Sequence, residues 1–347
     1  MKKRIFFVLA LCLALVLLAG CGAKNPEETP SSDNVETGLA SQTGSAPETD
    51  APETAPVPVE IRLGGMKGPT TMGLVKLLDA AEKGETVDTY TFTLAAAADE
   101  LTPKLLSGDL DIAALPLNLC SVLYNNSNGK VALAALNTLG VVYIVEKGGE
   151  EIKSLADLKG KTVYATGKGT TPEYALSYLL SLVGMDIEKD LDMVWMSEPT
   201  EVVSRLAAEE HAFAMMPQPY VTVASGKLEN FRVALDLTEI WDSYKNGSTF
   251  ITAGFLVRKE FAQQNPEALS RFLTEYAASA AFANESVAET AVLVEKYGIV
   301  SASVAEKAIP ACHIVCVTGE EMKTLASGYL GVLFGQNAKA VGGALPA

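Results

Sequence analysis

The sequence predicts an α/β fold with two lobes, each built on a mostly parallel sheet flanked by helices. Short apolar runs rich in Val, Ile and aromatic residues alternate with helical patterns, which is typical of βαβ units. The strand patterns form two groups, before and after residue 148, and a mainly helical region follows from 259 to 335. About 290 residues follow position 57, more than one hydrophobic core usually covers, so two lobes are expected.

The expected elements are defined by their apolar periodicity. Strands are predicted at 57–63, 90–95, 110–115, 131–135, 140–146, 161–166, 191–196, 211–216, 231–235 and 249–257. Between them, helices are predicted at 70–82, 99–107, 118–125, 171–184 and 199–209.

Residues 1–20 have the three-part pattern of a secretory signal peptide. Three basic residues precede an apolar run at 5–18, which is too short to span a bilayer comfortably as a helix of about 20 residues. The segment ends in Leu18-Ala19-Gly20-Cys21, which resembles the lipobox of bacterial lipoproteins. That resemblance implies cleavage before Cys21 and acylation of this residue, palmitate included. An ordinary cleaved signal that ends near a Cys is the alternative.

Residues 21–57 are predicted to form a disordered acidic linker behind the lipidated Cys21. The segment from 22 onward has seven acidic residues and one Lys, a net charge of −6 out of −15 for the whole chain. It has too few large apolar side chains to offset the entropy of ordering, and its expected reach is roughly 30–36 Å. An acidic ligand-binding tail is the alternative. No basic run remains that favours nucleic acid as a partner.

The cysteines outside the signal region do not predict a disulfide framework. Besides Cys21, the chain after the signal has Cys120, Cys312 and Cys316, an odd number for disulfide pairing. We expect buried thiols, although a Cys312–Cys316 bridge or a metal site stays open as an alternative. A metal site is disfavoured because the only histidines are His211 and His313.

Two turns that follow predicted strands share Lys-Gly, a Thr pair and a neighbouring Pro. The first is Gly64–Gly73, with Lys67, Thr70 and Thr71, and the second is 167–173. Ligands of open α/β sheets bind beyond the carboxyl ends of strands, where helix N-termini carry free N–H groups. The expected ligand contacts are therefore Thr70, Thr71, Thr170 and Thr171, with Met72 lining the cleft and Lys67 and Lys168 as further candidates. Well-capped helices without a ligand are the alternative.

Three further turns at predicted strand ends add Asn118 to the expected ligand contacts and Gln218, Trp195 and Tyr220 to the further candidates. Asn118 begins a helix, Gln218 follows the strand that ends at Met216, and both can be caps rather than ligand contacts. Trp195 and Tyr220 can stack on a flat ligand or belong to the core. Because none of these turns contains Arg, a small oxyanion or a flat heterocycle fits better than a carboxylate held by an Arg fork.

Several stretches of the body resemble the substrate-binding proteins of ABC importers, in the nitrate, sulfonate, taurine and thiamine-precursor group. They are Gly68-Pro69-Thr70-Thr71-Met72-Gly73-Leu74, the run GDLDIA at 108–113, the run SLADLKGKTV at 154–163, and Gly169-Thr170-Thr171. The resemblance covers residues 58–345 and implies the type II periplasmic-binding fold. It does not extend to the identity of the ligand, for which sulfonate, nitrate, taurine-like and pyrimidine-type solutes are candidates.

The resemblance implies lobes at 58–145 plus 249–347 and at 146–248, with crossovers near 142–148 and 248–256. It also implies that the lobes close on a solute and then dock on an ABC permease and its ATPase. We expect a monomer outside the cytoplasmic membrane, attached to it only through Cys21, with no cofactor, no metal and no catalytic residues. A ligand-presenting sensor lipoprotein is the main alternative, and an enzyme on the same fold is a further one.

Overall fold

The computed structural model describes residues 56–346, in which eleven strands form two separate sheets. The expected signal peptide, Cys21 and nearly all of the expected linker lie outside the described residues. Within the described part, no helix has both the length and the apolar character needed to cross a membrane.

The first sheet has six strands in the order β11-β4-β10-β3-β1-β2. Strands β1 to β4 run in one direction, and β10 lies antiparallel between β3 and β4. All five residues of β3 are buried, as expected for a strand covered on both faces. The strands are β1 (Glu60–Met66), β2 (Thr89–Ala95), β3 (Ile112–Pro116), β4 (Val131–Leu139), β10 (Ile251–Arg258) and β11 (Ile314–Val317).

The second sheet has five strands in the order β7-β6-β8-β5-β9, and only β5 runs antiparallel to the others. Its strands come from one continuous stretch of chain. They are β5 (Val142–Lys147), β6 (Thr162–Thr166), β7 (Asp192–Met196), β8 (Ala212–Pro217) and β9 (Phe231–Asp236).

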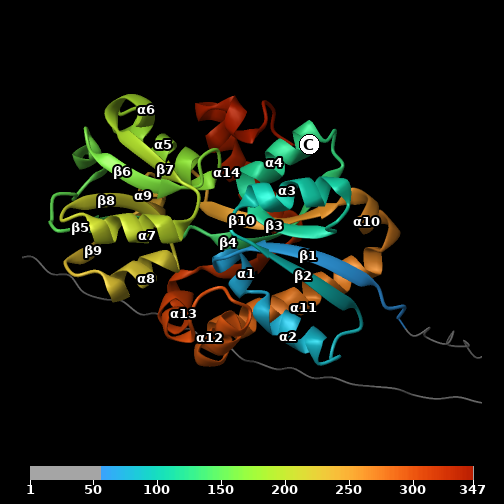
Figure 1. Cartoon of the computed structure of the whole chain (residues 1–347). Helices are drawn as coiled ribbons and strands as arrows, with labels where there is room; N and C mark the ends of the chain where they lie inside the picture. The colour runs from blue at the N-terminus through green and yellow to red at the C-terminus, as the bar shows by residue number, and fades with distance from the viewer. Residues whose placement is uncertain (1–55, 347) are drawn as a thin grey trace, which may run out of the picture. The chain divides into compact units, whose positions relative to one another are not determined.

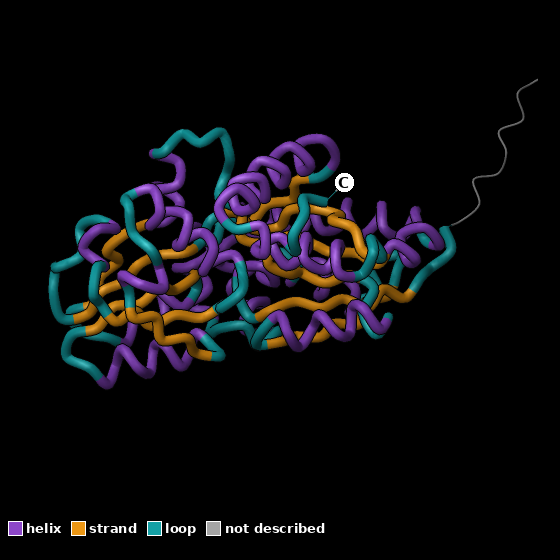
Figure 2. Tube along the Cα trace, turned by 90° about the horizontal axis from the view of Figure 1, so that it is seen from above, coloured by secondary structure: helices purple, strands orange, loops and turns teal. Residues whose placement is uncertain are grey.

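Helices cover both faces of each sheet (Figures 1 and 2). On the first sheet, α3 and α4 cover one face, and α2, α11, α12 and α13 cover the other. On the second sheet, α5 and α9 cover one face, and α7 and α8 cover the other. The helices are α1 (Pro69–Met72), α2 (Val75–Glu82), α3 (Ala98–Ser107), α4 (Leu117–Asn126), α5 (Thr171–Leu182), α6 (Ile187–Asp190), α7 (Pro199–Ala208), α8 (Tyr220–Lys227), α9 (Leu237–Ser243), α10 (Lys259–Gln264), α11 (Pro266–Glu285), α12 (Val287–Lys296), α13 (Ala302–Ala308) and α14 (Gly319–Gln336). Short 3₁₀ turns occur at η1 (Leu155–Leu158), η2 (Ile309–Ala311) and η3 (Ala338–Val341).

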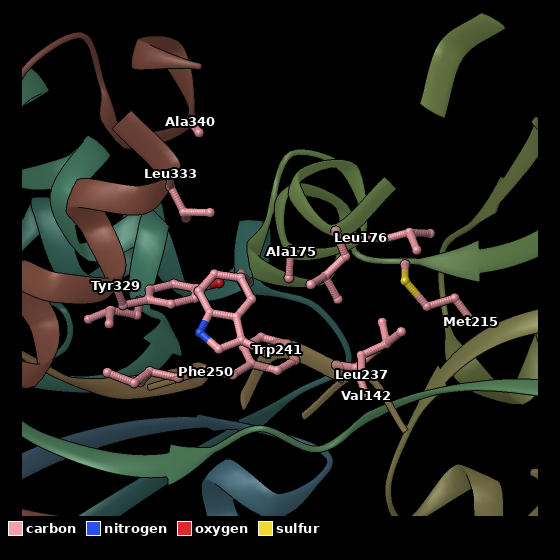
Figure 3. Close-up of a cluster of buried hydrophobic side chains, with 14 of the residues drawn as sticks. Val142, Ala175, Leu176, Met215, Leu237, Trp241, Phe250, Tyr329, Leu333 and Ala340 are labelled. Carbon is pink, nitrogen blue, oxygen red and sulfur yellow. The ribbon is translucent and has the colours of Figure 1, made fainter. Parts of the chain in front are cut away.

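One hydrophobic cluster continues from the first sheet to the second. It joins residues of α3 and α4 to residues of α5, α9 and α14. At its centre Trp241 packs against Phe250 and Tyr329, with ring centroids 5.4 and 5.2 Å away (Figure 3). The two sheets therefore share a core in this conformation.

Two features differ from the sequence-based expectation. The region 259–335, expected to be almost wholly helical, contains strand β11, which pairs with the edge of β4. In addition, the chain passes from the first sheet to the second between Leu139 and Val142, slightly before the expected crossover at 142–148. The run 140–146 was read as one strand, but Gly140 and Val141 connect the sheets instead.

Candidate functional site

The carboxyl ends of the parallel strands in both sheets converge on the segment Gly140–Val141. This segment, called the passage below, connects the first sheet to the second. Strand β4 ends at Leu139, and β5 begins at Val142 on the edge where β8 ends, because Val142 pairs with Pro217. The turns after β1, β3, β6 and β8 therefore lie along two edges that meet at this passage. Such edges, with the N-termini of the following helices, are where open α/β folds place their ligands.

The turn after β1 brings Thr70 and Thr71 to the first of these edges. Gly68 has φ of 153°, which favours glycine, and Pro69 begins the short helix α1. The Thr71 hydroxyl donates to the Met66 carbonyl at 2.6 Å. A Cβ on Gly65 would lie 2.4 Å from the Thr71 oxygen, so glycine is required for this close approach.

The turn after β6 brings Thr170 and Thr171 to the second edge. Gly167 and Gly169 have positive φ, and Thr170 is the N-cap of α5. The Thr170 hydroxyl donates to the Gly167 carbonyl at 2.6 Å and makes no cap hydrogen bond. The Glu173 carboxylate accepts from the Gly169 N–H, so the acid contacts the turn rather than the cap residue.

Asn118 connects the two edges directly. Its side chain is fully buried and lies in the first turn of α4. The Nδ2 group donates to the carbonyls of Gly169 and Ala340, both at 3.1 Å. The Oδ1 atom accepts from the Thr171 hydroxyl at 3.3 Å. All the hydrogen-bonding groups of this amide are thus used within the protein, and Asn118 links α4 to the α5 turn instead of capping its own helix.

The turn after β8 presents Gln218 and Tyr220, which are 7% and 4% exposed. Gln218 Oε1 accepts from the Thr222 hydroxyl at 2.9 Å. Tyr220 packs with α7 and the remainder of α8 in the cluster on one face of the second sheet. Trp195 lies near the carboxyl end of edge strand β7, where it pairs with Ala165 of β6 and packs against the shared hydrophobic cluster.

Of the three remaining predicted residues, one is buried and two are exposed. Met72 has no exposed surface, and its sulfur lies 3.8 Å from the Cys312 thiol in the core of the first sheet. In this conformation it does not line a cleft, and neither do Thr71 and Thr171, which also have no exposed surface. Lys67 and Lys168 are both exposed on their turns, and no ion pair of the described region includes either of them.

Asn137 belongs to the same edge but was not predicted. Its Nδ2 group donates to the Thr70 carbonyl at 3.3 Å, and its Oδ1 atom is enclosed without a hydrogen-bond partner in the described region. The signal in the sequence was a polar pair, Asn137-Thr138, inside the apolar run of β4. Reading that run only to residue 135 left the pair outside the predicted strand.

Three surface cavities lie beside the described elements, and only the first touches one of these turns, through Glu173. A cavity of about 310 Å³ is bounded by α5, α6 and the end of α14, and one of about 360 Å³ by α3, β10 and α10. A third, of about 400 Å³, lies between α8 and β9 on one side and Lys307 of α13 on the other. None of them includes a predicted site residue.

The thiols and acidic groups supply no evident metal centre. Cys120, Cys312 and Cys316 are free, and burial raises the pKa of the Cys120 thiol to about 12. Within residues 56–346, no group of three or more His, Cys, Asp or Glu side chains is placed to hold a metal ion.

Comparison with known families gives a match over most of the body. Residues 82–307 match the family described as the phosphonate periplasmic substrate-binding protein of an ABC transporter. This family is a transport component and not an enzyme family. Four Brucella relatives, named only as binding proteins, are 30% identical over 149 residues; the Brucella abortus strain 2308 protein is one of them. The match spans 42% of this chain and 43% of that relative, so less than half of its length is covered.

Solved structures share the fold at low sequence identity. An ABC transporter protein from Parabacteroides distasonis is 23% identical, with a TM-score of 0.66, covering 83% of this chain and 96% of the other. The alkanesulfonate-binding protein of Xanthomonas axonopodis pv. citri, bound to MOPS, is 14% identical, with a TM-score of 0.66 and coverage of 84% and 96%. The nitrate-binding protein of Synechocystis is 16% identical, with a TM-score of 0.56 and coverage of 70% and 66%. The fold is therefore the two-lobed periplasmic-binding-protein fold.

Proposed function

Because the chain belongs to the family of phosphonate periplasmic substrate-binding proteins of ABC transporters, we propose that it is an extracytoplasmic solute receptor. It binds a small solute between its two lobes and delivers it to an ABC permease and its ATPase. The candidate solutes are phosphonates, sulfonates, nitrate and pyrimidine-type compounds. We further propose attachment to the membrane through a lipid on Cys21 and action as a monomer.

The observation that carries this proposal is the meeting of the two carboxyl edges at one passage of chain. The turns bearing Thr70 and Thr71 on one side and Thr170 and Thr171 on the other follow β1 and β6. Helix α5, twelve residues long, directs its N-terminus toward the same region, and a helix N-terminus favours anions and acceptor atoms.

Closure of the lobes is the proposed mechanism of capture. We propose lobes at 58–145 plus 249–347 and at 146–248, with rotation about the segments that connect the two sheets. Asn118 stabilises the closed arrangement, because its amide forms hydrogen bonds with Gly169 and Thr171 of the other lobe. A solute that contacts both edges favours the closed arrangement to the extent that it binds this arrangement more tightly than the open one.

A thermal-shift screen tests the proposal with the purified protein. Methylphosphonate, taurine, alkanesulfonates, MOPS, nitrate, pyrimidines, amino acids and polyamines would each be added at increasing concentration. We expect one class to raise the melting temperature, because a ligand that binds only the folded state stabilises it by mass action. A melting temperature unchanged by every compound would contradict the proposed solute classes.

Substitution of the threonines then tests the location of the site. We expect Thr70→Val and Thr171→Val to weaken binding of the identified solute by at least about tenfold, or ~1.4 kcal/mol, in isothermal titration calorimetry. Thr274→Val is the matched control, because this exposed hydroxyl donates only within its own helix α11. Wild-type affinity in both site variants would contradict the location of the site at these turns.

A further inference from the structure

Two buried tyrosines have hydroxyl groups without a hydrogen-bond partner in the described part of the chain. Tyr143 and Tyr220 are 7% and 4% exposed, yet neither hydroxyl has a hydrogen-bond partner among residues 56–346. Buried tyrosines usually do find a partner. In this protein Tyr164 donates to Glu209 at 2.6 Å, and Tyr276 donates to the Val315 carbonyl at 3.0 Å.

The two hydroxyls also differ from the buried tyrosine hydroxyls that have neither a hydrogen-bond partner in the described region nor contact with solvent. The hydroxyl oxygens of Tyr297 and Tyr329 are sealed from solvent and lack a partner in the described region. Those of Tyr143 and Tyr220 are not among the sealed atoms, so they reach the surface of the protein. A donor that is nearly buried but still accessible, with no partner among residues 56–346, is satisfied only by water or another group from outside those residues.

Both tyrosines lie at the carboxyl edge of the second sheet. Tyr143 is the second residue of β5, and Tyr220 is the first residue of α8, just after β8. Tyr143 pairs with Met216 in β8, so their side chains share the face on which Tyr220 packs. Burial chiefly raises the pKa of Tyr143, and the carboxylate of Asp236, its partner residue in β9, raises it further.

The threonines at the two edges cannot supply the same donors. A hydroxyl has one proton to donate, and each of these four threonine hydroxyls directs it to an acceptor within the protein. The acceptors are Met66 O for Thr70 and Thr71, Gly167 O for Thr170 and Asn118 Oδ1 for Thr171. Thr71 and Thr171 have no exposed surface in this conformation, so only Thr70 and Thr170 can turn a lone pair toward a solute, and they do so as acceptors.

Gln218 adds one more free donor on the tyrosine side. Its Oε1 atom accepts from Thr222, whereas its Nε2 group has no acceptor in the described part of the chain. The unused donors at the passage thus come from β5, the β8–α8 turn and α8, all in the second sheet and its helices. The free donors are thus the two tyrosine hydroxyls and the Gln218 amide, whereas the threonine hydroxyls are acceptors.

We propose that Tyr143, Tyr220 and Gln218 form the donor side of the solute site and bind the acceptor oxygens of the solute. This inference rests on the proposed function and deepens it. The solute carries at least two acceptor atoms, as sulfonates, phosphonates and nitrate do, and these atoms face the tyrosines. Any donor group of the same solute faces the threonine hydroxyls. Tyr143 and Tyr220 are specificity-determining residues for this acceptor group.

The test removes each hydroxyl and measures two properties of the purified protein. In the first, the melting temperature is measured without solute. Tyr143→Phe and Tyr220→Phe are expected to melt within about one degree of wild type or slightly higher, because no internal hydrogen bond is lost. Tyr276→Phe is the matched control and is expected to melt lower, since its buried hydroxyl has a partner.

In the second measurement, calorimetry gives the affinities for methanesulfonate, methylphosphonate and nitrate. Each site variant is expected to lose at least tenfold in affinity for whichever probe wild type binds, and Tyr244→Phe, on the surface at 39% exposed, to lose nothing. Wild-type affinity in both site variants would overturn the donor side while leaving the proposed function intact. If wild type binds none of the probes, the solute classes of the proposed function fail. A clearly lower melting temperature in both site variants would by itself overturn the donor side, because it would reveal an internal partner.

Discussion

The carboxylate of Asp111 joins three strands of the first sheet. It is 1% exposed and accepts from Arg62 of β1 at 2.6 and 2.8 Å and from Arg258 of β10 at 2.9 Å. Burial alone raises the pKa of Asp111, but the hydrogen bonds from the two guanidinium groups outweigh burial and hold it below its ordinary value. The ionised form is therefore favoured by folding.

We expect Asp111→Asn to lower the free energy of unfolding by about 3 kcal/mol at pH 7, because two arginines lose their buried partner. A carboxylate with a lowered pKa contributes stability above its unfolded pKa of about 3.9, and this stability is lost as pH falls through the lower folded value. The variant should therefore lose less stability than wild type on acidification. Urea unfolding at several pH values measures both effects. The exposed Asp109→Asn is the control, and an equal loss in the two variants would contradict this role.

The thiols differ in burial, which predicts an order of reactivity. Cys120 and Cys312 are 3% and 0% exposed, whereas Cys316 is only half-buried. Burial raises the pKa of all three thiols, and only the thiolate reacts readily. We expect iodoacetamide to label Cys316 first in the native protein, as mapped by mass spectrometry. Faster labelling of Cys312 would show that the Met72 region opens in solution.

At the site, the sequence could identify turns but not the hydrogen bonds within them. Thr70, Thr71, Thr170 and Thr171 were found because Gly, Pro and Thr have strong local preferences at helix starts. The direction of each hydroxyl depends on contacts between distant segments, such as Asn118 with Thr171. Tyr143 had no local signal at all, since it lies inside the apolar run of β5.

At the scale of elements, the segment between the two sheets is tightly packed. A Cβ on Gly140 would lie 2.2 Å from the Thr238 hydroxyl and 2.9 Å from the Phe250 ring. The Gly140 carbonyl also accepts a hydrogen bond from the His313 ring. Helix α9, the start of β10 and the turn before β11 therefore all contact this segment.

We expect Gly140→Ala to lower the free energy of unfolding by about 1–3 kcal/mol, because the added methyl group displaces α9 or Phe250. Gly226→Ala is the matched control. Nothing lies within 4 Å of a Cβ at Gly226, and alanine is the better helix former in α8. The midpoint of chemical denaturation should be lower than that of wild type for Gly140→Ala and higher for Gly226→Ala. A neutral Gly140→Ala would mean that the passage can widen at little cost.

Most strands were predictable because their apolar runs are bounded by turn residues. Strand β11 was missed because four residues inside a helical region give too short a pattern. Its pairing with β4 is a long-range contact that local preference does not indicate. The antiparallel position of β10 between β3 and β4 likewise depends on the whole sheet.

At the scale of the molecule, the shared core couples the two sheets. Trp241 of α9 has no exposed surface and packs on Tyr178 of α5, with ring centroids 4.9 Å apart, as well as on Phe250 and Tyr329. These residues come from helices on the second sheet and from segments that pack on the first. Removing the indole should therefore affect both sheets.

We expect Trp241→Ala to lower the free energy of unfolding by about 3–5 kcal/mol and to separate one calorimetric transition into two. Differential scanning calorimetry measures the transition, and small-angle scattering measures any expansion. Trp195→Ala is the control, since that side chain is only partly buried on an edge strand. A single sharp transition in Trp241→Ala would show that other contacts couple the sheets.

The chain path through the two sheets also sets the order in which they can be completed. All strands of the second sheet lie between 142 and 236, so this sheet can pair fully once that stretch is available. In the first sheet, β10 lies between β3 and β4 and pairs with both, and it begins more than a hundred residues after β4 begins. Pairings across such a long separation close slowly. We therefore expect the second sheet to fold early during synthesis, while β3 and β4 of the first sheet wait for β10.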